Sequence, residues 1–153
     1  KFGADIQGAG YNAYQSPVAV GAGELLGKGS GQGSQSKLRF LPEYETDFIF
    51  AAFTEEWGFV GAVILLILCL ILLVRITANA ELAATNFETL FGLGVVVWLS
   101  LHLVVHAGMN MGVLPVTGIT FPFMSYGGSH LLTEWFALGI LSSMKRHSQG
   151  PRL

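Results

Sequence analysis

The sequence predicts an all-α polytopic membrane protein, in which a long outward-facing loop precedes three transmembrane helices and an irregular outward turn separates the last two. Composition is the first observation: of the 153 residues, 52% are hydrophobic and 12% are charged, and the mean hydropathy is +0.56. A soluble domain usually carries about 25% charged residues. The second observation is that no charged residue occurs from Phe59 to Val74 or from Thr89 to Thr133. Uncharged apolar stretches of this kind are typical of membrane spans.

The first half of the chain divides where charge and composition change. Residues 1–46 are polar and rich in glycine, which predicts an extracytoplasmic loop. Residues 47–76 are predicted to form the end of this loop and the first span, with acids near its start and Arg75 near its end. Pro42 suits the first turn of a helix, so we expect the helix to begin there. Residues 77–88 are predicted to be a polar cytoplasmic connector.

The uncharged stretch in the second half is too long for one span of about 20 residues. Prolines and glycines interrupt it near its middle. We therefore predict a second span at 89–113, an extracytoplasmic turn at 114–129, a third span at 130–146 and a cytoplasmic tail at 147–153. Irregular backbone at membrane depth must bond to protein or water, so the turn should pack against the protein or line a cavity.

Basic residues predict the orientation in the membrane. Arg75, Lys145, Arg146 and Arg152 fall on the side of the connector and the tail, while the 114–129 turn has no Lys or Arg. Because positive charge collects on the cytoplasmic side, the loop and the turn are expected to face outward. The net charge of −2, without a basic block, argues against nucleic acid as a partner.

Asp47 and Glu43 are the most informative acids, because they lie at the start of the first span. They are four residues apart and would share one helix face if the helix begins at Pro42. Repulsion between like charges and partial burial both favour the protonated form, which helps a general base to accept a proton. The same two carboxylates suit a divalent cation such as Mg or Mn. An acid in solvent that caps the helix is the equally supported alternative.

Several other residues have an open role. His102 and His106 are four apart, as metal ligands on a helix can be, but helix packing or hydrogen bonding is the favoured interpretation because no carboxylate or cysteine accompanies them. Glu134 lies in the third span, where an acid usually has a partner, and the sequence does not identify that partner. The roles of these three residues and of His130 stay undetermined.

A glycine-rich run from Gly21 to Gly29 contains Lys28. It lacks the pattern of a phosphate-binding loop, although exposed amides and one ammonium group suit a diphosphate. A flexible loop is the favoured interpretation of this run.

Together these segments resemble the SEDS family (shape, elongation, division, sporulation), the membrane proteins that include RodA and FtsW. The matching pieces are, in chain order, Gly8-Ala9-Gly10-Tyr11-Asn12, Gln15-Ser16, Leu26-Gly27-Lys28-Gly29, Gln32-Gly33, Gln35-Ser36, Phe40-Leu41-Pro42-Glu43, Thr46-Asp47-Phe48-Ile49-Phe50-Ala51, Glu55-Glu56, Gly58, Gly108-Met109, Leu114-Pro115-Val116-Thr117-Gly118 and Ser125-Tyr126-Gly127-Gly128-Ser129. The resemblance covers nearly the whole chain, corresponds to the C-terminal portion of the family's proteins and is closer to RodA than to FtsW.

The resemblance implies a multi-pass enzyme of the bacterial cytoplasmic membrane, with an outward-facing active site. Such an enzyme polymerises lipid II into glycan strands, with inversion and with undecaprenyl diphosphate as the leaving group, and works with a class B penicillin-binding protein. The resemblance implies that Asp47 is the catalytic residue. The candidate substrate-binding residues are Lys28, Gln32, Gln35, Lys37, Arg39, Glu43, Ser125, Tyr126 and Gly127. No covalently bound cofactor and no set of metal ligands is predicted, although Mg or Mn at the acidic pair stays open.

The chain differs from the family pattern at three positions: His106 stands where Asn is usual, His130 where a small residue is usual, and Glu45 where His or another polar residue is common. The family's N-terminal spans are missing, so this chain alone is expected to be inactive. Two other functions stay open, namely a lipid-linked precursor transporter (flippase) and a non-enzymatic scaffold of the wall-synthesis complex. The sequence does not distinguish elongation, division and sporulation.

Overall fold

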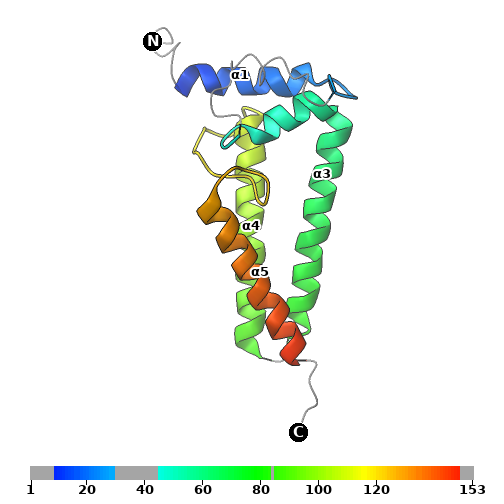
Figure 1. Ribbon diagram of the computed structural model, residues 1–153, viewed down its shortest axis with the longest axis vertical. Helices are drawn as coiled ribbons and strands as arrows, with labels where there is room; N and C mark the ends of the chain where they lie inside the picture. Colours follow the sequence, from blue (N-terminus) through cyan, green and yellow to red (C-terminus); the bar gives the residue numbers. More distant parts are fainter. Residues whose placement is uncertain (1–8, 30–44, 84, 149–153) are drawn as a thin grey trace.

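The protein is all-helical over the residues that its structure, a computed structural model, describes, which are 9–29, 45–83 and 85–148. The helices are α1 (Ala9–Ala22), α3 (Ile49–Glu81), α4 (Asn86–Asn110) and α5 (Gly128–Ser148) (Figure 1). No strand occurs among these described residues. The predicted all-α fold class is therefore confirmed.

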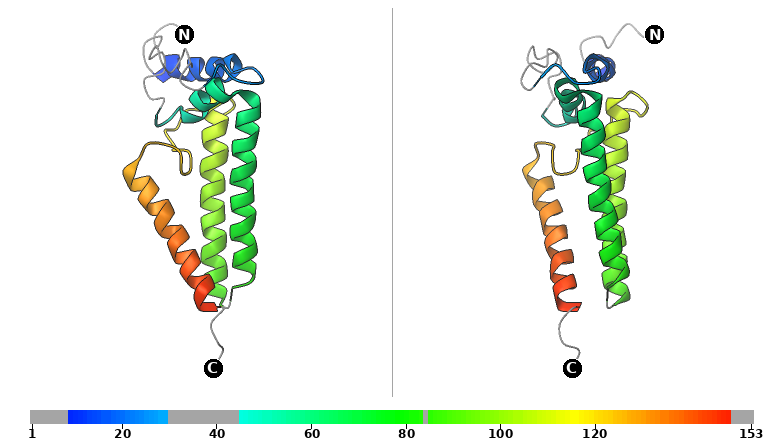
Figure 2. Two further views of the ribbon diagram at one scale, coloured as in Figure 1. Left: turned by 45° about the vertical axis from the view of Figure 1, so that its right-hand side comes forward. Right: turned by 90° about the vertical axis from the view of Figure 1, so that its right-hand side faces the viewer.

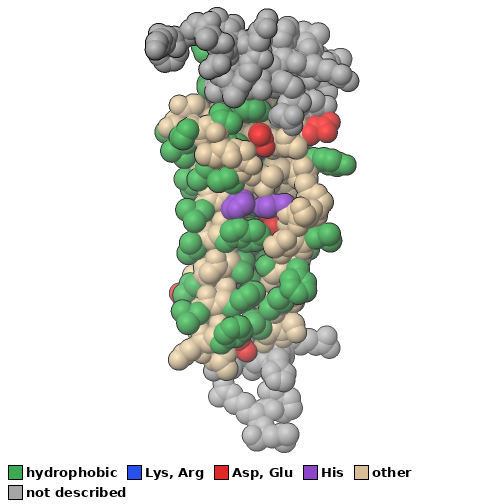
Figure 3. Space-filling model, turned by 90° about the vertical axis from the view of Figure 1, so that its left-hand side faces the viewer, with side chains coloured by type: hydrophobic (Ala, Val, Ile, Leu, Met, Phe, Trp, Pro, Cys, Tyr) green, Lys and Arg blue, Asp and Glu red, His purple; other side chains and the backbone are tan. Residues whose placement is uncertain are grey.

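The long helices α3 and α4 form the body of the molecule. They run antiparallel and side by side, α5 leans away from them at one end, and α1 lies across that same end (Figure 2). Both α3 and α4 are long and apolar enough to cross a membrane, since even α4, with 25 residues, extends about 37 Å against a hydrocarbon core of about 30 Å. Hydrophobic side chains are spread along the long face seen in Figure 3, and many large ones on the helices are exposed, as expected of a surface that meets lipid or other spans.

The predicted third span corresponds to α5. Its 21 residues are enough to match the thickness of a membrane. Among the described helices, however, α3 and α4 are the two that are both long enough and apolar enough to span one. A third span therefore stays a prediction.

The helix ends differ from the predicted boundaries. The first long helix continues past Ile76 to Glu81, so the polar connector is shorter than residues 77–88. The next helix begins at Asn86 because the side chain of Thr85 accepts a hydrogen bond from the Glu88 backbone N–H, which caps the helix.

A helix also occurs inside the region predicted as an extracytoplasmic loop. Helix α1 contains Pro17 and is not amphipathic in its pattern, so hydrophobic periodicity does not reveal it. It is held by tertiary contact instead: Ala19 is fully buried and packs against Phe48 and Ala51 at the start of α3.

Helix α3 is bent at Gly58, where the backbone is not helical (φ 71°, ψ −173°). The segment 24–29 fills the gap in the hydrogen-bond ladder that this bend creates. Its carbonyl groups at Glu24 and Leu25 accept hydrogen bonds from the N–H groups of Phe59 and Val60. The two helical pieces are therefore joined through a loop from elsewhere in the chain, which satisfies backbone groups that would otherwise be left unpaired.

Candidate active site

Asp47 lies in a turn formed by residues 45–48, directly before α3, and its side chain is half-buried. The helix was expected to begin at Pro42, but it begins at Ile49. Asp47 is therefore outside the helix, and the expectation that it shares a helix face with Glu43 is wrong. Pro42 and Glu43 themselves lie outside the described residues.

The turn is anchored from its C-terminal side by burial. Phe48 is 2% exposed, and Phe50 stacks on Phe121 of the 114–129 turn, with ring centroids 5.9 Å apart. Phe121 is itself 1% exposed. Phe48 and Phe50 alternate along the chain with Asp47 and Ile49. Asp47 is therefore held next to packed apolar side chains.

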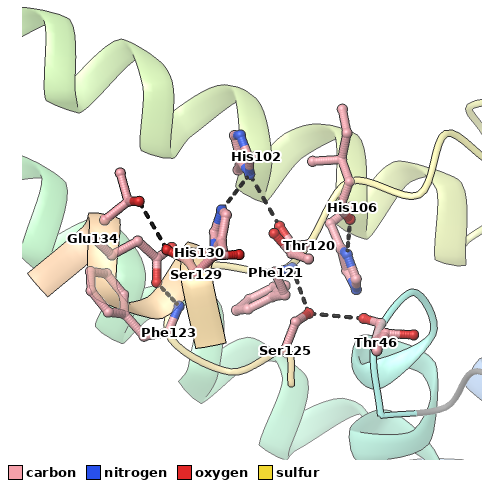
Figure 4. Close-up of polar contacts among 12 residues, drawn as sticks. Thr46, His102, His106, Thr120, Phe121, Phe123, Ser125, Ser129, His130 and Glu134 are labelled. Atoms are coloured by element: carbon pink, nitrogen blue, oxygen red, sulfur yellow. Dashed lines mark hydrogen bonds and ion pairs between the residues drawn. The ribbon is translucent and has the colours of Figure 1, made fainter. Parts of the chain in front are cut away.

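The 114–129 turn packs directly against the turn that carries Asp47 (Figure 4). The Ser125 hydroxyl donates to the Thr46 carbonyl at 2.9 Å and accepts from the Phe121 N–H at 2.7 Å. The Tyr126 N–H donates to the Glu45 carbonyl at 2.8 Å. The structure thus brings Ser125 and Tyr126, two of the predicted substrate-binding residues, beside the predicted catalytic turn.

The other residues of this loop lie close by. Tyr126 is 78% exposed, so its side chain is available at the surface. Gly127 immediately precedes α5, and its carbonyl accepts from the Leu131 N–H. Gly118 lies close to the acid: a Cβ placed on it would lie 3.6 Å from Oδ2 of Asp47. Gly118 was part of the matching motifs but was not among the predicted site residues.

Lys28 was considered as a residue that contacts a diphosphate, but in the structure it contacts a carboxylate of the protein. Its ammonium group lies 2.7 Å from Oε1 of Glu55, whose side chain is fully buried, while the Lys28 side chain is 33% exposed. The lysine therefore neutralises a buried carboxylate. The predicted substrate-binding residues Gln32, Gln35, Lys37, Arg39 and Glu43 lie outside the described residues.

Asn110, which the sequence did not single out, holds the Asp47 turn from behind. It is fully buried, and its side-chain amide donates to the Asp47 carbonyl at 3.0 Å. No sequence pattern indicated this contact, because the two residues are far apart in the chain and a lone Asn at a helix end is usually a cap.

Two histidines and Glu134 bond to the backbone of the 114–129 turn, and a third histidine links two of them (Figure 4). Nδ1 of His106 lies 2.6 Å from the Ile119 carbonyl, and Nδ1 of His102 lies 3.3 Å from the Thr120 carbonyl. His130 of α5 connects to α4, since its Nε2 lies 3.2 Å from Nδ1 of His102. Its Nδ1 lies 3.3 Å from Oε1 of Glu134, which is on the same helix as His130. The partner of Glu134 that the sequence did not identify is thus His130.

Glu134 also reaches the loop backbone. Its Oε2 accepts a hydrogen bond from the Phe123 N–H at 2.9 Å. Among the described residues, no three His, Cys, Asp or Glu side chains are grouped to hold a metal ion. Glu43, one of the two carboxylates considered for Mg or Mn, lies outside the described residues, so that cation stays a prediction.

One cavity among the described residues is far from Asp47. It has a volume of about 440 Å³ and lies where α3 and α5 converge, between Arg75 and Lys145, at the opposite end of α3 (Figure 1). The Asp47 site is instead formed where the turn at residues 45–48 packs against the 114–129 turn.

The chain is similar to known proteins over nearly its full length. Residues 3–150 match the cell cycle protein family of FtsW, RodA and SpoVE. The chain is 45% identical over 143 residues to the peptidoglycan glycosyltransferase MrdB of Escherichia coli, which covers 94% of this chain and 39% of MrdB. It is 41% identical over 145 residues to the stage V sporulation protein E of Bacillus subtilis, which covers 95% of this chain and 39% of that protein. The chain thus spans about two fifths of these relatives.

Two solved structures have a similar arrangement of helices. One belongs to a study of how a peptidoglycan synthase complex coordinates polymerization and crosslinking, with a TM-score of 0.75, 32% identity, and coverage of 93% of this chain and 38% of that chain. The other is the rod shape determining protein RodA of Thermus thermophilus in an aspartate-to-alanine mutant, with a TM-score of 0.66, 31% identity, and coverage of 96% and 52%.

Proposed function

The chain belongs to the family of FtsW, RodA and SpoVE cell cycle proteins, and from this premise we propose that the protein is a membrane glycosyltransferase that polymerises lipid II into the glycan strands of peptidoglycan. The observation that supports this most directly is the placement of Asp47. A carboxylate in a fixed turn at the end of a long apolar helix is suited to act on a substrate that is anchored in the membrane and carries its sugars outside it.

Asp47 acts as the general base in this proposal. It takes the proton from the 4-hydroxyl group of the acceptor's N-acetylglucosamine. The oxygen forms a bond to the anomeric carbon of the donor's N-acetylmuramic acid, the bond from that carbon to the diphosphate oxygen breaks, and the configuration inverts. Undecaprenyl diphosphate leaves with the electron pair, so no protein acid is needed to protonate it.

The leaving diphosphate requires positive charge or N–H donors nearby. Lys28, Lys37 and Arg39 are the candidates in this chain. Lys28 has to serve its buried partner Glu55 as well, so we assign the larger share to residues outside the described part. The exposed Tyr126, whose N–H bonds to the carbonyl of Glu45, and the adjacent Gly127 are assigned to the sugar groups, since aromatic side chains and backbone polar groups commonly line ligand sites.

The partner and the orientation are also part of the proposal. A class B penicillin-binding protein would crosslink the strands that this enzyme makes, consistent with the likeness to a peptidoglycan synthase complex. Asp47 faces outward from the cytoplasmic membrane, because Arg75 and Lys145 lie at the other end of the helices (Figure 1) and positive charge marks the cytoplasmic side.

The test is polymerisation of purified lipid II by the full-length protein in detergent. Asp47→Asn keeps the size of the side chain and removes the base, so we expect the rate to fall by at least about 100-fold. Glu45→Gln is the matched control, since it neutralises an exposed acid two residues away, and it should keep at least half of the rate. If Asp47→Asn polymerises lipid II as fast as the unmodified protein, the assignment is wrong, and transport of the precursor or a scaffolding role would be favoured.

A further inference from the structure

Asn110 is the last residue of α4, and its side-chain amide is bonded on both sides inside the protein. Its Nδ2 donates to the Asp47 carbonyl at 3.0 Å and to the His106 carbonyl at 2.9 Å. Its Oδ1 accepts from the Ala51 N–H at 3.1 Å and lies 3.4 Å from the Ser16 hydroxyl. A primary amide has two donors and an acceptor oxygen, so both donors and the acceptor of this buried group have partners.

Two of these contacts replace a hydrogen bond that a regular helix would make between residues 47 and 51. In a regular helix, the carbonyl of residue 47 would bond directly to the N–H of residue 51. Here the Asn110 amide stands between these two groups and bonds to each of them. The direct helical pattern begins one residue later, with the Ala52 N–H bonded to the Phe48 carbonyl at 3.0 Å.

The consequence is that Asp47 is kept out of the helix. Because the amide occupies the place of the first helical hydrogen bond, α3 begins at Ile49 and Asp47 belongs to the turn before it. In this turn the Asp47 carboxylate lies against Gly118, on the loop that carries the exposed Tyr126.

We infer that Asn110 is a positioning residue that sets the orientation of the Asp47 carboxylate toward the acceptor sugar. The inference rests on the proposed function, because it assumes that Asp47 is the general base. Asn110 does not touch substrate in this view. It acts through the backbone of residues 47–51, because one planar amide both donates to the Asp47 carbonyl and accepts from the Ala51 N–H.

The alternative is that Asn110 only stabilises the fold, and Ser16 provides the means to separate these roles. The Ser16 hydroxyl is also fully buried and donates to the Asn110 backbone carbonyl at 2.8 Å. Ser16→Ala removes a hydrogen bond that ties α1 to the same end of α4, but it leaves the contacts from Asn110 to Asp47 and Ala51 in place. Ser16→Ala therefore removes a buried hydrogen bond, as the Asn110 variants do, but does not release the Asp47 turn.

The experiment measures kcat and KM for lipid II with the full-length protein in detergent, together with the thermal unfolding temperature. The variants are Asn110→Asp, Asn110→Leu and Ser16→Ala. Asn110→Asp keeps the shape and loses the donors to the Asp47 and His106 carbonyls, so it decides the question if Asn110→Leu does not fold. We expect kcat of Asn110→Asp to fall about 100-fold, as a shift of about 1 Å in a reacting group can cause. KM should stay within about twofold, and Ser16→Ala should keep its kcat within about twofold of the unmodified protein.

A second arm tests whether the effect passes through Asp47. In an Asp47→Asn background, Asn110→Asp should cause no further loss of the residual rate. A folded Asn110→Asp protein with normal kcat would overturn the inference, as would an equal fall in kcat for Ser16→Ala or a further loss in the Asp47→Asn background. Normal activity of Asp47→Asn alone would instead overturn the proposed function, so the two failures are distinguishable.

Discussion

The contact between Gly58 and Gly27 leads to a strong prediction about stability. Helix α3 bends at Gly58, and the loop that contains Gly27 fills the bend. A Cβ on Gly58 would lie 2.3 Å from the Gly27 nitrogen and 2.6 Å from both the Leu25 carbonyl oxygen and the Leu26 carbonyl carbon. All three are backbone atoms, so a side-chain rotation cannot relieve the clash. Gly58→Ala is therefore expected to separate the loop from the helix.

The size of the effect follows from two contributions. The backbone at Gly58 has φ 71° and ψ −173°, a region that is essentially open to glycine alone, and another residue there costs about 1–3 kcal/mol. Moving the loop also weakens the hydrogen bonds that Phe59 and Val60 donate to it, each worth about 1 kcal/mol. We expect Gly58→Ala to reduce the free energy of unfolding by about 4 kcal/mol.

The assay is thermal unfolding of the full-length protein in one detergent. Gly94→Ala is the matched control, since Gly94 lies in α4 and a Cβ there would have no neighbour within 4 Å. Alanine in a helix is favoured over glycine by about 0.5–1 kcal/mol, so Gly94→Ala should unfold at the same or a higher temperature. The reasoning is refuted if Gly58→Ala unfolds with the unmodified protein, or if both variants lose the same number of degrees.

Two further changes test the surroundings of the site. Lys28→Met removes the ammonium group next to the buried Glu55 carboxylate, and we expect it to lower the free energy of unfolding by about 3 kcal/mol, measured by thermal unfolding. Ser125→Ala removes the hydroxyl that joins the Phe121 N–H to the Thr46 carbonyl. It should cost about 2 kcal/mol, because a buried N–H loses its partner, and it should also lower the rate of lipid II polymerisation, because the Asp47 turn loses a support.

Each of these changes has a control of the same chemistry. Lys145→Met removes an exposed lysine that is hydrogen-bonded to Asn79, so it should change stability by less than about 0.5 kcal/mol. Ser129→Ala alters an exposed serine near Ser125 and should leave both stability and rate nearly unchanged. Equal losses for Lys28→Met and Lys145→Met would contradict the importance of the buried ion pair. A Ser125→Ala protein with full activity would contradict the supporting role of the loop contact.

Local sequence patterns were enough to predict the long helices. Uncharged apolar stretches identify α3 and α4 because burying apolar surface in a membrane depends on composition over a window of residues and not on which residues touch. The start of α4 depends on Thr85, a cap that acts within one turn of the chain. The start of α3 is different: Pro42 suggested an early start, but Asn110, which is distant in sequence, holds Asp47 outside the helix.

The candidate site divides in the same way. Asp47, Ser125 and Tyr126 were found from motifs. Only the tertiary structure showed that the Ser125 hydroxyl and the Tyr126 N–H bond to the turn at residues 45–46. The pairing of His130 with Glu134 follows helical spacing, but its continuation to His102 crosses from one helix to another.

The sequence by itself determined that this is a helical membrane protein of the FtsW, RodA and SpoVE family and that Asp47 is its leading candidate for catalysis. Only the tertiary structure decided how Asp47 is held, because the Asn110 amide, the Gly27–Gly58 contact and the Ser125 hydroxyl join segments between 31 and 79 residues apart. Hydropathy and helix caps act over one or two turns. The direction of a carboxylate depends on hydrogen bonds and close backbone contacts between distant segments, which no local pattern specifies.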